Sequence, residues 1–389
     1  MGSIDSSSSS SNLFKPLTLS SAVKPLGHRI AMAPLTRFRA DDDHVPITSL
    51  MAKYYAQRAS SLPGGLIITE ATFISPTAGG MANVPGIWND AQAKAWKEIT
   101  DAVHAQGGII FLQLWSLGRA ALQDVADKEG FTIHSASDIP IPEEGSAKPK
   151  AMSVEEIKIR IKEYAAAAKN AVERAGFDGV EIHGANGYLI DQFTQDTSNN
   201  RTDEYGGSIE NRSRFALEAI DAVVEAVGAE RTGIRLSPWS KFQGMRMEDP
   251  VPQFSHLITK IKEKHQLAYL HFVQARVAGN KTEGSEHDKQ EESLDFAFDI
   301  WKGPVLIAGN LESDSAKYLV DKEYKDRDVI AVFGRYFIST PDLPFRVREG
   351  IELNPYDRDT FYLAKSPVGY IDQPFSKEFE KLNGVRAQI

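Results

Sequence analysis

The sequence predicts an α/β fold, a (β/α)8 barrel of the TIM-barrel type formed as a single domain. Eight short apolar runs alternate with segments whose apolar residues recur at helical spacing. Strands alternating with helices are typical of a parallel sheet, and eight such units close naturally into a barrel. A doubly wound sheet is the alternative. We disfavour it because no glycine-rich dinucleotide fingerprint follows the first run.

The apolar runs have the length and composition of buried strands in a parallel sheet. In chain order they span residues 30–33, 66–69, 109–112, 177–182, 233–236, 268–273, 305–308 and 329–333. Helices are predicted between them at residues 49–59, 91–105, 153–174, 208–227, 252–264, 294–301 and 313–321. The third helix has defined ends, because Ser153 and Glu156 have capping-box spacing and Gly176 follows as a stop.

The chain has 389 residues, more than the roughly 250 that such a barrel needs. We place the excess in an N-terminal lead-in, in the long connection 115–151 after the third strand, and in an extension after Gly350. The connection holds three prolines and few apolar residues, so we expect a surface lid or hairpin beside the site. The serine-rich residues 1–12 are predicted to be a disordered tail, and residues 13–389 one domain.

Composition excludes several classes of protein. A net charge of −9 without basic clusters argues against nucleic-acid binding. The absence of cysteine excludes disulfides, zinc–thiolate sites, iron–sulfur clusters and a thiol nucleophile. No apolar run is long enough to span a membrane. We therefore expect a cytoplasmic protein, a monomer or homodimer, without nucleic-acid or membrane partners.

The fourth apolar run ends in three polar side chains within six positions. His183, Asn186 and Tyr188 follow one another there, separated by Gly184 and Gly187. The histidine and the amide can both donate hydrogen bonds to one oxygen, and the phenol offers a proton nearby. A lone histidine is more often a core residue, but three convergent polar groups at one strand end point to an active centre.

The other predicted strands also end in polar residues or glycine, namely Thr36, Gln113, Arg235, Gly309, Asn310, Gly334 and Arg335. Because active sites of this fold lie at the carboxyl ends of the strands, these residues must surround something large and polar. The last four follow the seventh and eighth strands, where phosphate sites of the fold recur. Glycine there allows backbone N–H groups to approach phosphate oxygens. A phosphorylated planar cofactor would fit.

Four motifs at these strand ends complete the pattern: APLTR at 33–37, QLW at 113–115, HGANGYL at 183–189 and GRYF at 334–337. Together they resemble the old yellow enzyme family of flavin-dependent ene-reductases, and the resemblance runs from Leu13 to about Phe379. Residues 84–88 and 340–346 are similar to a fungal branch that includes ergot-alkaloid reductases. Ala71 stands where yeast members have glycine. Because that position contributes mainly backbone, we expect little consequence.

The resemblance implies non-covalent FMN, reduction by NADPH, and reduction of carbon–carbon double bonds conjugated to a carbonyl. Thr36 would hydrogen-bond the flavin O4, Gln113 its pyrimidine edge, and Arg235 would lie beside N1 and O2. The phosphate would be held by Gly309, Asn310, Gly334 and Arg335. The remaining cofactor contacts implied are Pro34, Leu35 and Ala71.

For the substrate, the resemblance implies an enone whose carbonyl oxygen is polarised by His183 and Asn186. Hydride would come from flavin N5, and Tyr188 would protonate the α-carbon from the opposite face. Tyr362 would form part of the substrate wall. In the ergot-related branch, phenylalanine at the Tyr188 position goes with double-bond isomerisation, so tyrosine favours net reduction.

Three alternatives remain open from the residues alone. Arg235 could simply neutralise Glu181, because both point inward on the strand alternation. A metal-dependent barrel hydrolase could use His183, His271 and a carboxylate, although it needs more strand-end histidines and acids than this chain has. A non-catalytic flavin-binding protein is the third. The intact set of His183, Asn186 and Tyr188 argues against it.

Overall fold

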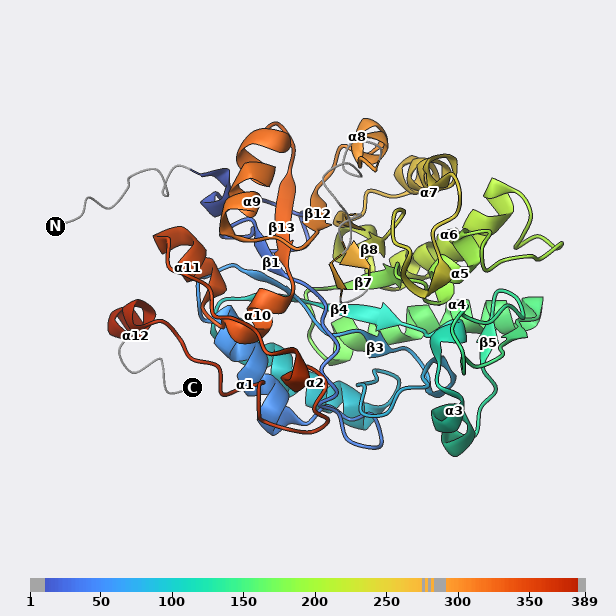
Figure 1. Ribbon diagram of the computed structural model, residues 1–389, viewed down its shortest axis with the longest axis horizontal. Coiled ribbons are helices and arrows are strands. Elements are labelled where there is room, and N and C mark those ends of the chain that lie inside the picture. Colours follow the sequence, from blue (N-terminus) through green and yellow to red (C-terminus); the bar gives the residue numbers. More distant parts are fainter. Residues whose placement is uncertain (1–10, 275–276, 279–280, 283–291, 384–389) are drawn as a thin grey trace.

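Eight parallel strands close into the predicted (β/α)8 barrel (Figure 1). The computed structural model describes residues 11–274, 277–278, 281–282 and 292–383. Strand β2 pairs with both β1 and β4, so the sheet order β2-β1-β13-β12-β9-β8-β7-β4 returns to its start. The barrel strands are β1 (Ile30–Met32), β2 (Leu66–Ile68), β4 (Ile109–Trp115), β7 (Gly179–Gly184), β8 (Thr232–Leu236), β9 (Tyr269–Val273), β12 (Val305–Ala308) and β13 (Val329–Phe333).

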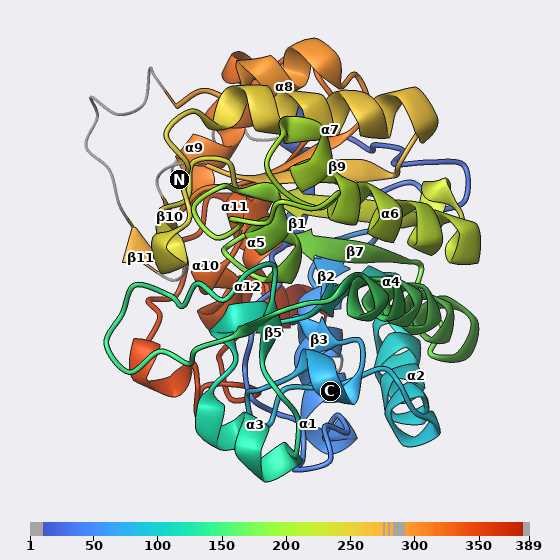
Figure 2. The ribbon, with the colours of Figure 1, turned by 90° about the vertical axis from the view of Figure 1, so that its right-hand side faces the viewer.

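Helices cover the outside of the barrel, and Figure 2 shows α4, α6 and α7 along one side of it. Those predicted are present: α1 (Thr48–Ala59), α2 (Asp90–Ala105), α4 (Val154–Lys169), α6 (Ile209–Val227), α7 (Pro250–Lys264), α8 (Asp295–Ile300) and α9 (Ser313–Tyr318). Both α4 and α9 continue into a π-helical turn. The predicted capping box of Ser153 and Glu156 is confirmed, and Gly176 has a left-handed φ of 75° just beyond the helix.

Several shorter elements were not predicted from the sequence. These helices are α3 (Gln123–Glu129), α5 (Leu189–Thr194), α10 (Arg335–Ser339), α11 (Leu343–Glu349) and α12 (Lys377–Asn383). The short strand β3 (Thr72–Phe73) pairs with the end of β4, and β10 (Val277–Ala278) pairs with β11 (Lys281–Thr282).

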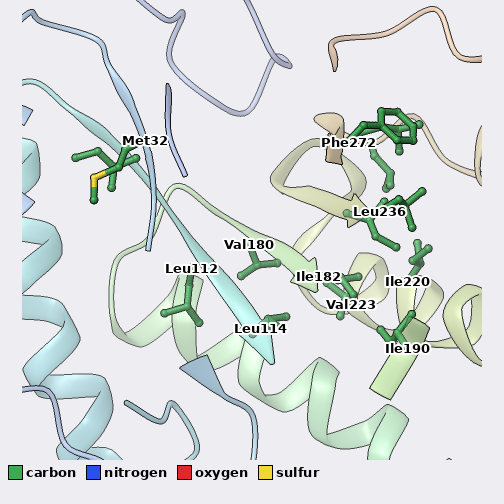
Figure 3. Packing of buried hydrophobic residues seen from close by; sticks show 14 of the residues in the cluster. Met32, Leu112, Leu114, Val180, Ile182, Ile190, Ile220, Val223, Leu236 and Phe272 are labelled. Carbon is green, nitrogen blue, oxygen red and sulfur yellow. The ribbon is translucent and has the colours of Figure 1, made fainter. Parts of the chain in front are cut away.

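Side chains alternate between the two faces of each barrel strand. Leu112 and Leu114 of β4 pack in the core between strands and helices, with Val180 and Ile182 of β7 (Figure 3). The residue between the two leucines, Gln113, points into the barrel, where it meets β7 from the inside. The polar residues at the strand ends therefore belong to the inward-facing set.

At the amino-terminal ends of the strands, the barrel interior is apolar and is closed by the N-terminal lead-in. Leu17 and Leu26 of the lead-in bridge each other, and both pack against the first residues of barrel strands, including Leu66, Ile109 and Leu306. Burial of this plug excludes water from the amino-terminal end of the barrel. A ligand can therefore enter only from the carboxyl ends of the strands.

The insertion after β4 is confirmed, but it is not an antiparallel hairpin. Its strands β5 (His134–Ser135) and β6 (Lys150–Ala151) pair in parallel, and α3 precedes them. It also has more apolar anchors than expected, because Leu117, Ala126 and Ile133 are buried in a cluster of their own. The buried Arg119 donates to the backbone oxygen of Gln243 at 2.9 Å, which ties the insertion to the loop after β8.

The two chain ends differ in part from expectation. Residues 1–10 of the predicted tail lie outside the described residues. Ser11 and Asn12 are ordered, because Ser11 Oγ and the Asn12 N–H donate to the carboxylate of Asp321 at 2.6 and 2.7 Å. The described part of the C-terminal extension passes back over the barrel and ends with α12. In the described part of the chain, no helix is long and apolar enough to cross a membrane.

The capping box gives a direct test of the local interactions in this fold. Ser153→Ala removes the acceptor for the Glu156 N–H, so the free energy of unfolding should fall by about 1 kcal/mol. Ser153→Asp keeps a capping oxygen and should stay close to the wild type. Urea unfolding followed by circular dichroism measures both. Equal stability of the alanine and aspartate variants would contradict a stabilising cap at this position.

Candidate active site

A cavity of about 380 Å³ opens at the carboxyl ends of the barrel strands. Every site residue predicted from the sequence lines it: Pro34, Leu35, Thr36, Ala71, Gln113, His183, Asn186, Tyr188, Arg235, Gly309, Asn310, Gly334, Arg335 and Tyr362. Residues from all eight barrel strands or the loops that follow them meet there, together with Tyr362 from the C-terminal extension. The predicted site residues, from Pro34 to Tyr362, are thus brought together from distant parts of the sequence.

Several aromatic lining residues were not identified as site residues from the sequence. They are Phe242, Tyr336 and Phe361, whereas Trp115 was expected at most as a packing aromatic. Tyr336 and Phe361 adjoin predicted site residues in sequence, so a signal was present. Phe242 lies in the irregular loop after β8, and no periodicity or motif marks it.

The turn after β7 holds Asn186 in a fixed orientation. Asn186 and Gly187 both have left-handed φ values, 58° and 75°, which asparagine and glycine adopt most readily. The Asn186 N–H donates to Ser237 Oγ at 2.7 Å, and the Gly187 N–H donates to the buried Asp191 carboxylate at 2.9 Å. Because strand β8 and helix α5 both anchor this turn, its two functional side chains have little freedom to move.

His183 is buried and neutral. Its pKa lies well below the usual range because burial disfavours the charged ring, and Arg235 and His271 add positive charge nearby. The N–H of Ala185 approaches Nδ1 at 3.4 Å, so Nδ1 accepts and the proton is carried by Nε2. This tautomer makes His183 a hydrogen-bond donor at Nε2.

Asn186 and Tyr188 complete a compact group around this histidine. The Tyr188 ring lies 4.9 Å from the His183 ring and 4.8 Å from that of Trp115, both edge-on. Burial raises the pKa of Tyr188, so its hydroxyl stays protonated at neutral pH. The buried Oδ1 of Asn186 has no hydrogen-bond partner among the described residues. A polar ligand could satisfy this amide.

A buried carboxylate organises the polar layer beneath the cavity. Glu181 accepts from Gln113 Nε2 at 2.7 Å and from His271 Nδ1 at 2.8 Å. Gly233 of β8 lies between Glu181 and Tyr269 in the sheet, and a Cβ there would lie 2.5 Å from the Tyr269 ring. Because an ionised carboxylate only accepts, the Gln113 amide nitrogen must face Glu181, and the amide oxygen remains for a donor in the cavity.

Arg235 does not form the structural ion pair that the sequence left open. Within the described residues it forms no salt bridge with Glu181 or with any other carboxylate, and its buried Nε has no hydrogen-bond partner. Burial lowers its pKa, while the charge of Glu181 opposes that change. A buried guanidinium that faces a cavity without a paired carboxylate suits an electron-rich ligand, because the charge of Glu181 offsets its desolvation only in part.

The opposite wall carries the second cation and two glycines. Arg335 Nη2 donates to Asn310 Oδ1, and Asn310 has a left-handed φ of 55°. A Cβ at Gly309 would lie 2.1 Å from the Gln274 side chain, so this position has no room for one. Backbone N–H groups at glycines beside a guanidinium suit a phosphate. Together with the donors of Arg235 and the accepting oxygen of Gln113, these groups fit the phosphate and the pyrimidine edge of FMN.

A metal centre does not fit the same residues. His271, which the hydrolase alternative requires, is engaged by Glu181 inside the barrel and does not line the cavity. Over the described ranges, no three His, Asp or Glu side chains are grouped so that they could hold an ion. Among the described residues, the cavity lining contains one imidazole, that of His183, and no carboxylate, whereas a catalytic metal takes several such ligands.

Comparison with known proteins agrees with this geometry. Residues 12–354 match the model of the NADH:flavin oxidoreductase / NADH oxidase family. The chain is 55% identical to the chanoclavine-I aldehyde reductase fgaOx3 of Penicillium roqueforti, over 95% of this chain and 98% of that one. It is 52% identical to the NADP-dependent oxidoreductase lnbE of Aspergillus flavus, over 97% and 99% of the two chains.

The similar proteins also include one named as inactive and one of known structure. A protein of Claviceps fusiformis named as a probable inactive dehydrogenase, easA, is 50% identical over 95% of this chain and 96% of its own. Among solved structures, the old yellow enzyme of Pichia sp. AKU4542 superposes with a TM-score of 0.86 at 40% identity, covering 95% of this chain and 94% of that one. The chain therefore belongs to the NADH:flavin oxidoreductase family of old yellow enzymes, oxidoreductases that use FMN and a reduced nicotinamide nucleotide.

Proposed function

We propose that this enzyme reduces the carbon–carbon double bond of α,β-unsaturated aldehydes and ketones, with NADPH as the preferred reductant. The observation that carries the proposal is the convergence of neutral His183, Asn186 and protonated Tyr188 on one cavity. The names of two relatives, an aldehyde reductase and an NADP-dependent oxidoreductase, support the substrate class and the reductant. A role in fungal secondary metabolism is consistent with the first of them.

His183 and Asn186 bind the carbonyl oxygen of the substrate. The Nε2–H of His183 is a neutral donor, and the Asn186 amide carries N–H donors while its buried Oδ1 has no partner among the described residues. Two donors on one oxygen withdraw electrons from the conjugated system and make the β-carbon electrophilic. A neutral histidine performs this task without transferring its own proton.

Tyr188 supplies the proton. Bound FMN, once reduced by the nicotinamide nucleotide, would supply the hydride for the β-carbon. The resulting negative charge is borne by the oxygen between His183 and Asn186, and the α-carbon then takes the proton of the Tyr188 hydroxyl. Because burial raises the pKa of Tyr188, the donor form persists throughout the neutral range.

The remaining predicted residues hold the cofactor. We assign Thr36 to the flavin O4, Gln113 to its pyrimidine edge, and Arg235 to the neighbourhood of N1 and O2. Pro34, Leu35 and Ala71 contribute contacts from the loops after β1 and β2, and Gly309, Asn310, Gly334 and Arg335 hold the phosphate. The fixed cation at Arg235 favours negative charge next to it, so it stabilises the reduced form of the bound ring.

A non-catalytic flavin-binding protein is the second candidate, and the name of the Claviceps relative favours it. The arrangement of His183, Asn186 and Tyr188 favours catalysis, because a mere binding site has no need of a buried proton donor beside two oxyanion donors. Steady-state consumption of NADPH in the presence of a simple enone separates the two candidates.

The first expectation concerns how FMN is held. With no cysteine in the chain, we expect non-covalent contacts alone, so acid precipitation should leave a colourless pellet and free FMN in the supernatant. Chromatography of the released flavin is the measurement. FAD in the supernatant, or a flavin that remains with the denatured chain, would contradict this expectation.

Phenols test the oxyanion site separately from the cofactor. A phenolate oxygen between His183 and Asn186 imitates an enolate, so para-substituted phenols should produce a long-wavelength charge-transfer band. Each lost hydrogen bond to such an oxyanion costs about 1.5–3 kcal/mol, or about one to two decades of affinity. The double variant His183→Ala, Asn186→Ala should lose the band and remain yellow.

His104→Ala is the matched control for that double variant. His104 pairs with Asp178 at 2.9 Å on the outer side of the barrel and does not line the cavity. Its loss should leave the band unchanged. Undiminished phenol binding by the His183 and Asn186 double variant would place the oxyanion site elsewhere.

Tyr188→Phe tests the proton donor. Reduction by NADPH should proceed as in the wild type, whereas the step with enone should slow by about two to four decades, the span of a lost general acid. Because its pKa is raised, loss of the Tyr188 proton should not limit the wild-type enone step below about pH 9. Stopped-flow spectroscopy of each half-reaction measures these rates.

Tyr164→Phe is the control for the tyrosine variant. Tyr164 is fully buried in the helical layer, and its hydroxyl has no partner among the described residues. Removing that hydroxyl should leave both half-reactions unchanged. Equal slowing of the two half-reactions by Tyr188→Phe, or normal enone reduction, would refute the role of Tyr188.

A further inference from the structure

One wall of the cavity comes from a segment without long regular structure. Between α11 and α12, residues 351–371 contain only one short helical turn, Arg358–Thr360, in the described chain. Phe361 and Tyr362 of this segment line the cavity. Phe361 is 3% exposed and Tyr362 is 46% exposed, which places the tyrosine at the mouth. Figure 1 shows this red segment passing beside the blue helix α1.

Irregular backbone that is buried must find hydrogen-bond partners for its carbonyl groups. Here the partners are arginine side chains. Arg37 Nε donates to the Phe361 oxygen at 2.9 Å, and Arg37 Nη2 donates to the Gly369 oxygen at 2.8 Å. The Arg37 guanidinium thus connects the backbone at Phe361, just before Tyr362, with the backbone at Gly369.

Arg39 holds the same segment from the other side. Its Nε donates to the Ser366 oxygen at 2.9 Å, its Nη1 to the Phe361 oxygen at 3.1 Å, and its Nη2 to the Val368 oxygen at 3.1 Å. Both arginines are fully buried. Together they fix the carbonyls on either side of the Tyr362 loop.

These two charges have no carboxylate partner in an ion pair among the described residues. Aromatic faces stabilise them instead, because Cζ of Arg37 and of Arg39 lies 5.0 and 4.6 Å from the centre of the Tyr370 ring. That ring stacks on Tyr54 of α1 at 4.0 Å. The arrangement is rigid because stacking and main-chain hydrogen bonds must break together if the segment moves.

Phe38, between the two arginines, touches the wall itself. Its ring lies 5.5 Å from that of Tyr362. Phe38 has a left-handed φ of 56°, an unfavourable conformation for a bulky residue, and its carbonyl accepts from the Lys365 N–H at 2.8 Å. The surrounding contacts therefore determine where this ring points.

We propose that Arg37, Phe38 and Arg39 determine substrate specificity by positioning Tyr362 over the mouth of the cavity. Tyr362 then contacts the part of the enone that lies away from the carbonyl and favours a flat apolar or aromatic substituent there. This inference rests on the proposed function of the cavity. Arg37 and Arg39 are positioning residues that touch neither substrate nor reacting atoms.

Arg39→Lys is the informative substitution, since Arg39 is farther along the chain from the proposed cofactor residue Thr36. Lysine keeps the charge but lacks the planar fork that reaches three carbonyls at once. We expect the variant to bind para-phenylphenol about tenfold more weakly than the wild type, because small misplacements of a positioning wall reduce binding strongly. Affinity for unsubstituted phenol, which does not extend to the wall, should stay the same.

Two further variants show that the effect passes through Tyr362. When Arg39→Lys is added to the Tyr362→Ala variant, the affinity for para-phenylphenol should fall by less than about a further twofold. This is expected when both substitutions remove the same interaction. Phe38→Ala should also weaken the binding of para-phenylphenol and leave the binding of phenol unchanged, although both arginines remain. This variant replaces Arg39→Lys as the test if the latter folds poorly.

Arg346→Lys is the matched control. Arg346 is also buried and donates to C-terminal carbonyls, those of Glu352 and Pro374, but it does not line or adjoin the cavity. It should leave both phenol affinities unchanged. The charge-transfer band reports binding without turnover, so failure of the wild type to reduce enones would count against the proposed function alone. Equal weakening of both phenols by Arg39→Lys, or a full effect in the Tyr362→Ala background, would overturn the inference.

Discussion

Strand alternation in a closed parallel barrel is the constraint on which the rest of this structure depends. Every second side chain enters the barrel, and in this chain the inward set is apolar at the amino-terminal end and polar at the carboxyl end. The amino-terminal end is filled by the N-terminal lead-in together with Leu66, Ile109 and Leu306. The carboxyl end holds Gln113, Glu181 and Arg235, which are buried, and buried polar groups need hydrogen-bond partners or compensating charges.

The buried arginines differ in the groups that compensate their charge. Arg37 and Arg39 are satisfied within the protein by backbone oxygens and by the Tyr370 ring, which makes them structural. Arg235 has no hydrogen-bond partner for its buried Nε among the described residues and faces the cavity, where the charge of Glu181 offsets part of its desolvation. The same residue type is thus found both in the wall of the cavity and among the groups that face into it.

Short-range signals made much of this predictable. The eight strands, the capping box at Ser153 and the clustering of His183, Asn186 and Tyr188 each depend on neighbours in sequence, so the sequence displays them directly. The parallel pairing of β5 with β6 could not be predicted, because two-residue strands have no period. Nor could the place of Phe242 in the cavity lining, because it lies in an irregular loop that no periodicity or motif marks.

By itself the sequence determined the fold class, the strand ends that carry polar groups, and the family to which they belong. Alternation and turn chemistry are local properties, and closure of eight parallel strands follows from them. Only the tertiary structure decided between alternatives for single residues. Arg235 faces the cavity and is not the ion-pair partner of Glu181, because Glu181 accepts from Gln113 and His271 instead. Pairing of buried groups depends on angles and distances across strands, and the order of residues along a chain does not specify these.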